Sequence, residues 1–504
     1  MESKNNTGSQ AKCIAVLGTG SDVGKSIIAT ALCRLLRQKG LRVAPFKAQN
    51  MSNNSGVTPN GLEMGRAQIV QAEAAKVIPN VDMNPILLKP TSEKGAQIVL
   101  LGKAVADSTA IEYHAQKERL FKTAAAALDR LRSQYDFVVL EGAGSCAEVN
   151  LMSQDIVNLK MASYADAPVI LVGDIHKGGI FAQLVGTLAC LSPEESRRIS
   201  GFIINRFRGD IRLFADGITW LEKKTGKKVF GVLPWYNHIH IEPEDSVVIE
   251  NPVPKVMTNS DLPAIGVIRL PHISNFNDFD PLSNLKQINL FFLKKPQDLA
   301  GFKAVILPGS KNTRFDLKWL KTSGWAARLN TYCRNKGFLL GICGGYQILG
   351  TVVHDPKGLE GPPGSTPGLG LLPVETTLQA PKTTSLTKFE GHNTVGQGYE
   401  IHMGQTLRHK GAPLFTVLER NSKPCRAKEG CISPDLHIMG TYLHGLFDNA
   451  GVRRWFLKVL GIKIISDDQL EGPAERDREY DLLAEHFKKY IDIDKLFQNT
   501  LGLI

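Results

Sequence analysis

The chain of 504 residues contains no run of 18 apolar residues, so we expect no membrane-spanning helix. Its first twelve residues, MESKNNTGSQAK, lack an apolar segment, which argues against a signal peptide and predicts a disordered lead-in over 1–12. No block of five like charges and no nucleic-acid signature motif occurs, although the net charge is +11. We therefore expect neither a membrane nor a nucleic acid as partner.

The cysteines form no Cys-x-x-Cys pair and no regular disulfide framework. Cys425 and Cys431 lie in a polar loop without two further metal ligands nearby, which argues against a zinc site. The simplest interpretation is a reduced, cytoplasmic protein. The eight cysteines are Cys13, Cys33, Cys146, Cys190, Cys333, Cys343, Cys425 and Cys431.

The composition is that of an ordinary globular protein, with 43% hydrophobic and 22% charged residues. The length predicts more than one domain. The basic charge balance suits a protein that handles small polyanionic molecules.

Apolar segments alternate with helical patterns in the first half, which predicts an α/β domain with a doubly wound parallel sheet. The strand-like segments are CIAVLG (13–18), RVAPFK (42–47), DFVVLEGAG (136–144), PVILVGD (168–174), GFIINRF (201–207) and KVFGVLPW (228–235).

A stretch rich in Pro, Asp and Glu follows and predicts a linker over 246–262. Strand-like segments then restart, which predicts a second α/β domain. These segments are AIGVIRL (264–270), KAVILPG (303–309), GFLLGIC (337–343) and HIMGTYLHG (437–445). The expected domains therefore span 13–245 and 263–490, with a C-terminal tail over 491–504.

The segment VLGTGSDVGKS follows a predicted strand and opens a predicted helix, as a phosphate-binding loop does. Backbone N–H groups from Gly18 and Thr19 to Gly24 would bind the phosphates of ATP. Lys25 would reach the terminal phosphates, and Ser26 would bind Mg²⁺. Gly18 and Gly24 enclose five residues, one more than the standard pattern. A glycine-rich turn without a ligand is the alternative.

The loop GTGSDVGKS resembles that of dethiobiotin synthetase and its relatives, ATP-dependent enzymes that activate carboxylates by phosphorylation. This resemblance implies that Lys47 is a second phosphate-handling lysine and that Asn205 contacts the adenine. Glu141, at the end of a predicted strand, would hold Mg²⁺ directly or through water. The alternative for Glu141 is a cap of the next helix.

The segment LLGICGGYQILG has the form strand, Gly-x-Cys-x-Gly, helix. Such a turn lifts the thiol of Cys343 above the sheet edge and directs a helix N-terminus at it, which favours a nucleophilic thiolate. A buried structural cysteine is the alternative. A cysteine nucleophile needs a base, for which we favour His444 in GTYLHGLFDN. His402 in GYEIHMG is the competitor.

The strand end LPGSKNT supplies Gly309 and Ser310. Their backbone N–H groups, with that of Gly344, would form an oxyanion hole.

His444 resembles the base of class I glutamine amidotransferases. In that class a glutamate usually follows the histidine by two residues, but here Leu446 stands in that place. Glu400 and Asp448 are both candidates to orient the imidazole, and the sequence does not choose between them.

A carboxylate-activating domain joined to a glutaminase predicts a glutamine-dependent amide ligase. Ammonia released from glutamine at one site would displace phosphate from an acyl phosphate at the other. A non-catalytic P-loop regulator is the alternative from a different class.

Together the motifs resemble the cobyric acid synthase family. The resemblance implies the substrate adenosylcobyrinic acid a,c-diamide, whose b, d, e and g carboxylates are amidated with ATP, Mg²⁺ and glutamine. The motifs are SDVGKS, FKAQNMSNNS, NPILLKP, EGAGSCAEVNL, GGIFAQLVGTL, NRFRGD, LPHISNFNDFDPL, LPGSKNT, GICGGYQ, GYEIHMG and GTYLHGLFD.

Three points stay open beside this resemblance. Cobyrinic acid a,c-diamide synthase, or another amidoligase of the same architecture, is the alternative within the class. His176 stands where the family pattern has an aspartate, which leaves the charge near the phosphates undecided. Asn50, Ser52 and Asn53 are candidates to face the substrate, or are turn residues.

Overall fold

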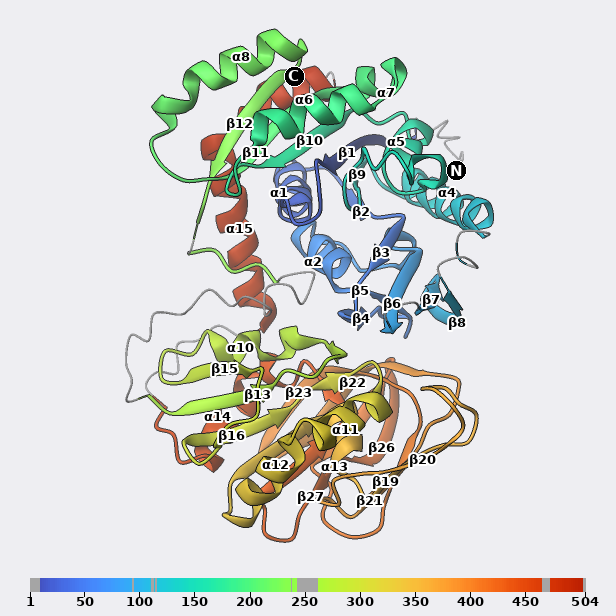
Figure 1. Ribbon diagram of the computed structural model, residues 1–504, viewed down its shortest axis with the longest axis vertical. Helices are drawn as coiled ribbons and strands as arrows, with labels where there is room; N and C mark the ends of the chain where they lie inside the picture. The colour runs from blue at the N-terminus through green and yellow to red at the C-terminus, as the bar shows by residue number, and fades with distance from the viewer. Residues whose placement is uncertain are drawn as a thin grey trace, which may run out of the picture.

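The computed structural model describes residues 10–92, 95–109, 113, 116–236, 238–242, 262–464 and 472–501, which form two α/β domains (Figure 1). The expected lead-in falls almost entirely on residues 1–9, and the expected linker on 243–261, both outside the described residues. Lys12 already belongs to the first strand. No described helix is long and apolar enough to cross a membrane.

The N-terminal domain is built on a six-stranded parallel sheet in the order β12-β11-β10-β1-β9-β2. The predicted doubly wound parallel sheet is thus confirmed. Its strands are buried on both faces, as their continuous apolar runs indicate. They are β1 (Lys12–Gly18), β2 (Val43–Phe46), β9 (Phe137–Glu141), β10 (Val169–Asp174), β11 (Ile199–Phe207) and β12 (Lys228–Pro234).

Helices cover both faces of this sheet, and each face has its own apolar core (Figure 1). The short α7 begins with a reciprocal capping box between Ser192 and Glu195. The helices are α1 (Lys25–Gln38), α2 (Arg66–Ala74), α4 (Lys117–Gln134), α5 (Leu159–Tyr164), α6 (Ile180–Cys190), α7 (Pro193–Arg198) and α8 (Ala215–Thr225), with 3-10 turns η1 (Val81–Met83), η2 (Met152–Gln154) and η3 (Ile211–Phe214).

Two small sheets extend this domain toward the second one (Figure 1). One has the order β3-β6-β7-β8, and the other is the β4–β5 hairpin. Their strands are β3 (Gln49–Met51), β4 (Ser55–Val57), β5 (Glu63–Gly65), β6 (Ile86–Ser92), β7 (Gly95–Leu100) and β8 (Lys103–Thr109).

The second domain also contains a six-stranded sheet, in the order β15-β13-β16-β18-β28-β27, with only β27 antiparallel. Its strands are β13 (Ala264–Ile268), β15 (Asn289–Leu293), β16 (Phe302–Leu307), β18 (Phe338–Ile342), β27 (Cys431–Ile432) and β28 (Ile438–Thr441). The helices are η4 (Phe276–Phe279), α10 (Asp280–Ser283), α11 (Thr313–Thr322), α12 (Trp325–Arg334), α13 (Gly344–Leu349), η5 (Leu446–Asp448) and α14 (Ala450–Val459).

Two further sheets flank this parallel sheet, beside the antiparallel β14–β17 pair. The first is antiparallel, with the order β26-β25-β22-β23-β29, and the second is mixed, with the order β20-β19-β21-β24 and a parallel pairing of β19 with β21. In the first, Tyr399 pairs with His444, which fixes the position of the histidine. The strands are β14 (Ile273–Ser274), β17 (Gly309–Ser310), β19 (Val352–Asp355), β20 (Gly364–Pro367), β21 (Val374–Thr377), β22 (Thr383–Gly391), β23 (Thr394–His402), β24 (Gln405–Arg408), β25 (Phe415–Arg420), β26 (Lys423–Glu429) and β29 (Leu443–His444).

The C-terminal helices α15 (Gly472–Tyr490) and α16 (Ile493–Leu501) return to the N-terminal domain (Figure 1). Leu483, Phe487 and Leu496 are buried in the same core as the apolar face of α1. Arg34 of α1 also pairs with Asp477 at 2.9 Å and Asp481 at 2.8 Å. The expected boundary, with 263–490 in the second domain and 491–504 as a tail, is therefore wrong for these helices.

Candidate functional site

The turn between β1 and α1 has the backbone conformation of a phosphate-binding loop. Gly24 precedes the helix with φ of 101°, in the left-handed region that favours glycine. A Cβ atom at Gly24 would lie 2.1 Å from Nδ2 of Asn205, so a side chain does not fit. Asn205 Nδ2 in turn donates to the carbonyl oxygen of Val23 at 2.9 Å. The predicted adenine-contacting residue thus supports the loop itself.

Lys25 closes the loop from inside. Its Nζ donates to the carbonyl oxygens of Gly20 at 2.8 Å and Gly144 at 2.9 Å. Gly18 is packed tightly, because a Cβ atom there would lie 2.7 Å from Val23. Thr19 turns its hydroxyl to Gln183 at 3.2 Å.

Glu141 is the centre of a buried polar cluster at the C-terminal edge of the sheet. It is 1% exposed. Ser26 Oγ donates to its Oε1 at 2.7 Å, and Lys47 Nζ lies 2.9 Å from the same oxygen. Gln71 Nε2 donates to Oε2 at 2.5 Å, and this contact was not predicted from the sequence. The predicted residues Ser26, Lys47 and Glu141 therefore meet at one point.

A cavity of about 1570 Å³ opens beside this cluster. Lys25, Ser26 and Lys47 line it. Trp235 and Arg208 also line it, with the guanidinium of Arg208 at 4.2 Å from the Trp235 ring centroid. Such a basic, partly aromatic cavity can bind a large polyanion.

His176, which stands where the family pattern has an aspartate, lies beside Trp235 and Asp174. His176 turns its ring toward Trp235, with centroids 5.2 Å apart, while its backbone N–H donates to Asp174 Oδ1 at 2.7 Å. Arg206 pairs with the other oxygen of Asp174 at 2.8 Å. Among the candidate substrate residues, Asn50 lines the cavity and donates to Gln68 at 3.1 Å.

In the second domain, Cys343 occupies a strained turn between β18 and α13. Its φ of 53° and ψ of −107° are unusual for a residue with a side chain and cost about 1–3 kcal/mol. A Cβ atom at Gly345 would lie 2.1 Å from the carbonyl oxygen of Leu307, so the turn requires glycine there. Cys343 is 6% exposed, and its Sγ lies 3.3 Å from the carbonyl oxygen of Ile401. These features match the predicted nucleophile elbow.

His444 is buried and faces this thiol, with which it shares a hydrogen bond. Its Nδ1 lies 2.6 Å from Asp278 Oδ2, and the Gly445 N–H donates to Asp278 Oδ1 at 2.9 Å. Burial lowers the pKa of His444, but the charges of Asp278 and Cys343 and their hydrogen bonds raise it to about 10. The imidazole is thus held as a cation beside the thiol.

The two predicted orienting carboxylates are engaged elsewhere. Glu400 binds Arg420 at 2.7 Å and Ser385 at 2.9 Å. Asp448 pairs with Arg476 at 3.3 Å. Asp278 takes their expected place, from a turn far away in the sequence.

His402, the competing base, has a different environment. Its ring stacks on Tyr442 with centroids 3.7 Å apart. Burial, together with the nearby positive charge of His444, lowers the pKa of His402 to about 4 against the attraction of Glu400. His402 therefore stays neutral, and no hydrogen bond to the thiol is seen for it.

The N–H groups of the expected oxyanion donors Gly309 and Ser310 point in opposite directions. Lys311 donates to the carbonyl oxygen of His272 at 2.9 Å, and Gly309 is opposite Ser274 in the same antiparallel ladder. Antiparallel pairs alternate, so the Gly309 N–H points to β14 and the Ser310 N–H points away from it.

Ser310 points instead toward the nucleophile turn. A Cβ atom at Gly344 would lie only 2.7 Å from the Ser310 nitrogen. Ser310 and Gly344 are thus the better-placed pair of donors. Gly309 instead leaves room for the imidazole, since a Cβ atom there would lie 3.2 Å from His444.

Comparisons with known proteins agree with this division into two sites. The family model described as CobQ/CobB/MinD/ParA nucleotide binding domain matches residues 14–247. The model described as CobB/CobQ-like glutamine amidotransferase domain matches residues 264–452.

Full-length relatives are more specific. A protein named cobyric acid synthase from Chlorobium phaeobacteroides (strain BS1) is 51% identical, covering 96% of this chain and 98% of the relative. One of the same name from Chlorobaculum tepidum is 50% identical, covering 96% and 97%. The chain belongs to the cobyric acid synthase family. As a member of the cobyric acid synthase family it is a glutamine-dependent amidoligase, and the alternative of a non-catalytic regulator is wrong.

Proposed function

We propose that this enzyme converts adenosylcobyrinic acid a,c-diamide to adenosylcobyric acid, a step of cobalamin biosynthesis. It amidates the b, d, e and g carboxylates through acyl phosphates, with ATP and glutamine as co-substrates. The name of the full-length relatives supports the substrate. The observation that carries the reaction is a buried Cys343–His444–Asp278 arrangement in one domain and a phosphate loop with Lys47 and Glu141 in the other.

The glutaminase half-reaction follows from the geometry around the thiol. The Cys343 thiolate attacks the carboxamide carbon of glutamine, and imidazolium His444 gives its proton to the departing ammonia. The N–H groups of Ser310 and Gly344 stabilise the oxyanion. Water, deprotonated by neutral His444, then cleaves the thioester to glutamate. Asp278 holds the ring orientation throughout.

The synthetase half-reaction uses the basic cavity. Lys25 and Lys47 neutralise the ATP phosphates while the substrate carboxylate attacks the γ-phosphorus, and ammonia then displaces phosphate from the acyl phosphate. Ser26 and Glu141 offer oxygen ligands 2.7 Å apart, which fits the preference of Mg²⁺ for oxygen donors. When bound, Mg²⁺ would neutralise further phosphate charge.

The decisive experiment separates the two sites. Cys343→Ala should abolish amidation with glutamine and leave amidation with high ammonium concentrations close to that of the wild type. Equal loss with both nitrogen sources would contradict the division of labour. Mass spectrometry of the corrinoid product tests the substrate: with ATP, Mg²⁺ and glutamine, failure to convert carboxylates of the a,c-diamide to amides would remove this choice of substrate.

A further inference from the structure

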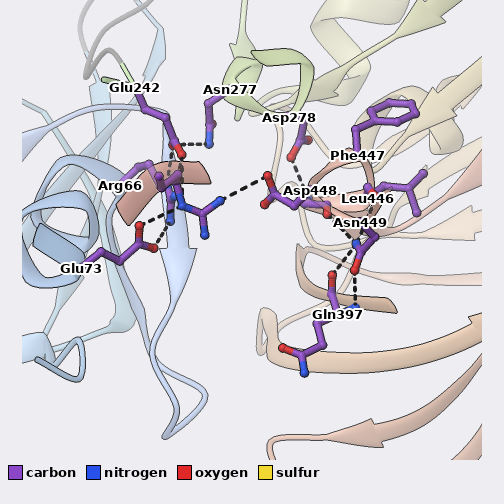
Figure 2. Close-up of polar contacts among 12 residues, drawn as sticks. Arg66, Glu73, Glu242, Asn277, Asp278, Gln397, Leu446, Phe447, Asp448 and Asn449 are labelled. Carbon is purple, nitrogen blue, oxygen red and sulfur yellow. Dashed lines mark hydrogen bonds and ion pairs between the residues drawn. The ribbon is translucent and has the colours of Figure 1, made fainter. Parts of the chain in front are cut away.

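A cluster of four charged residues lies where the two domains meet (Figure 2). Arg66 of α2 binds Glu242 through two hydrogen bonds of 2.6 and 2.7 Å and approaches Glu73 at 3.4 Å. Arg476 of α15 binds Glu73 at 3.0 Å and lies 4.0 Å from Glu242. All four residues belong to the N-terminal domain or to the C-terminal helix packed on it. We call them the interface cluster.

The interface cluster contacts both segments that carry the catalytic imidazole and its carboxylate. Asn277 Nδ2 donates to Glu242 Oε2 at 3.1 Å, and Asn277 directly precedes Asp278 in η4. Arg476 pairs with Asp448 at 3.3 Å, in the η5 turn that follows His444. Figure 2 shows Glu242 and Arg66 on one side and Asp278 and Asp448 on the other.

A second contact across the interface holds the same η4 turn. The Ser55 N–H, in the β4–β5 hairpin of the N-terminal domain, donates to Asn275 Oδ1 at 3.1 Å. Asn275 has φ of 51°, a left-handed conformation that asparagine tolerates. The turn bearing Asp278 is therefore fixed at two of its side chains by the other domain.

This arrangement bears on catalysis because the glutaminase geometry is strict. A misplacement of about 1 Å can lower a rate about 100-fold. The Asp278 carboxylate binds both the imidazole and the Gly445 N–H, so a shift of η4 moves the ring relative to the thiol.

We propose that Asn277 and Asp448 are positioning residues through which the interface cluster holds Asp278 and His444 in their productive geometry. The inference rests on the proposed function, since it presupposes that His444 and Asp278 serve the Cys343 thiol. The N-terminal domain then completes the glutaminase site of its neighbour.

Glu242, which accepts the hydrogen bond from Asn277, also lines the large synthetase cavity of the N-terminal domain. It lines in addition a cavity of about 270 Å³ next to Asn277, Asp278 and Gly445. A substrate in the large cavity therefore meets a residue that is bonded to the η4 turn.

The test is made on the full-length enzyme with three substitutions. Asn277→Ala should lower kcat for glutamine hydrolysis about 10- to 100-fold, change KM for glutamine less than about threefold, and leave ammonia-dependent amidation intact. Asn277→Asp places a second carboxylate against Glu242 and should be at least as impaired. Adding Glu242→Gln to it reverses donor and acceptor and should recover part of kcat.

The matched control breaks another interdomain hydrogen bond. Thr384 Oγ1, in β22, donates to the carbonyl oxygen of Gly61 in the β4–β5 hairpin at 2.7 Å, a bond that includes no residue of η4, so Thr384→Val should keep wild-type glutaminase activity. The proposal is overturned if Asn277→Ala stays within twofold of the wild type, if it loses ammonia-dependent activity equally, or if the double variant does not exceed Asn277→Asp. Cys343→Ala that still uses glutamine would instead refute the proposed function.

Discussion

The substitution Asp278→Asn removes one charge from the glutaminase site and keeps the shape of the side chain. The Asp278 carboxylate lies 2.6 Å from Nδ1 of His444, so the two charge centres are about 4 Å apart. At an effective dielectric constant near 20 their attraction is about 4 kcal/mol. Because 1.36 kcal/mol corresponds to one pKa unit, removing it should lower the pKa of His444 by about 3, from about 10 to about 7.

The sign of the pH effect follows from the raised pKa. In the wild type the imidazolium is fully present at neutral pH and is lost only as the pH rises through about 10. In Asp278→Asn it is lost as the pH rises through about 7. The alkaline limit of kcat/KM for glutamine should therefore move to lower pH by about 3.

At pH 8 about one imidazole in ten would keep its proton, which costs about tenfold in kcat/KM. Exchanging a charge-assisted for a neutral hydrogen bond adds about another tenfold, since the two differ by about 1.4 kcal/mol. We therefore expect about a 100-fold loss at pH 8 and a smaller loss at pH 6.

Glutamate release, followed from pH 6 to 10 without ATP, measures this profile. Glu400→Gln is the matched control, because Glu400 is bound to Arg420 and Ser385 rather than to His444. A profile of Asp278→Asn that overlays the wild type would refute the reasoning, as would the same shift in Glu400→Gln.

Three further outcomes are expected. Gly344→Ala should abolish glutaminase activity, because its Cβ would lie 2.7 Å from the Ser310 nitrogen. The control Gly301→Ala should keep this activity, because its Cβ would have no atom within 4 Å, and equal glutaminase rates in the two variants would contradict the oxyanion assignment. Glu141→Gln should lower ammonia-dependent amidation more than 100-fold and spare glutamine hydrolysis; unchanged amidation would remove Glu141 from the synthetase site. Arg34→Ala should lower the free energy of unfolding in urea by about 2 kcal/mol, because it breaks two charged contacts to α15; no change would show that these contacts add no stability.

Much of the synthetase site could be predicted because its residues follow the ends of parallel strands. Gly18, Glu141 and Asn205 end or nearly end β1, β9 and β11, and such ends meet at one edge of a sheet. The local motifs then place Lys25 and Ser26 at the helix start. Cys343 could also be predicted, because the strand, the glycine turn and the helix around it are contiguous in the sequence.

The orienting carboxylate could not be predicted in this way. Asp278 lies 166 residues before His444 and comes from a 3-10 turn rather than a strand end. Only the packing of η4 against η5 brings them together. Glu400 and Asp448 were nearer in sequence, but each is bound to an arginine, Arg420 or Arg476, that no local pattern connects to it.

The prediction of the domain boundary was wrong for a related physical reason. The charged, helical pattern of α15 and α16 shows an apolar face but not which core receives it. Leu483 and Phe487 fit against α1, more than 440 residues earlier in the chain. Helix periodicity carries no information on such a distant partner.

The return of α15 and α16 to the first core has a consequence for synthesis on the ribosome. The N-terminal domain is translated through residue 242, yet Phe487, Leu496 and Phe497, which complete the core on one face of its sheet together with α1, come only after the whole second domain. At a translation rate of about 5–20 residues per second, that apolar face remains without α15 and α16 for on the order of 10–50 s. During this interval the nascent chain exposes a surface that chaperones bind, and the two domains mature together rather than in sequence.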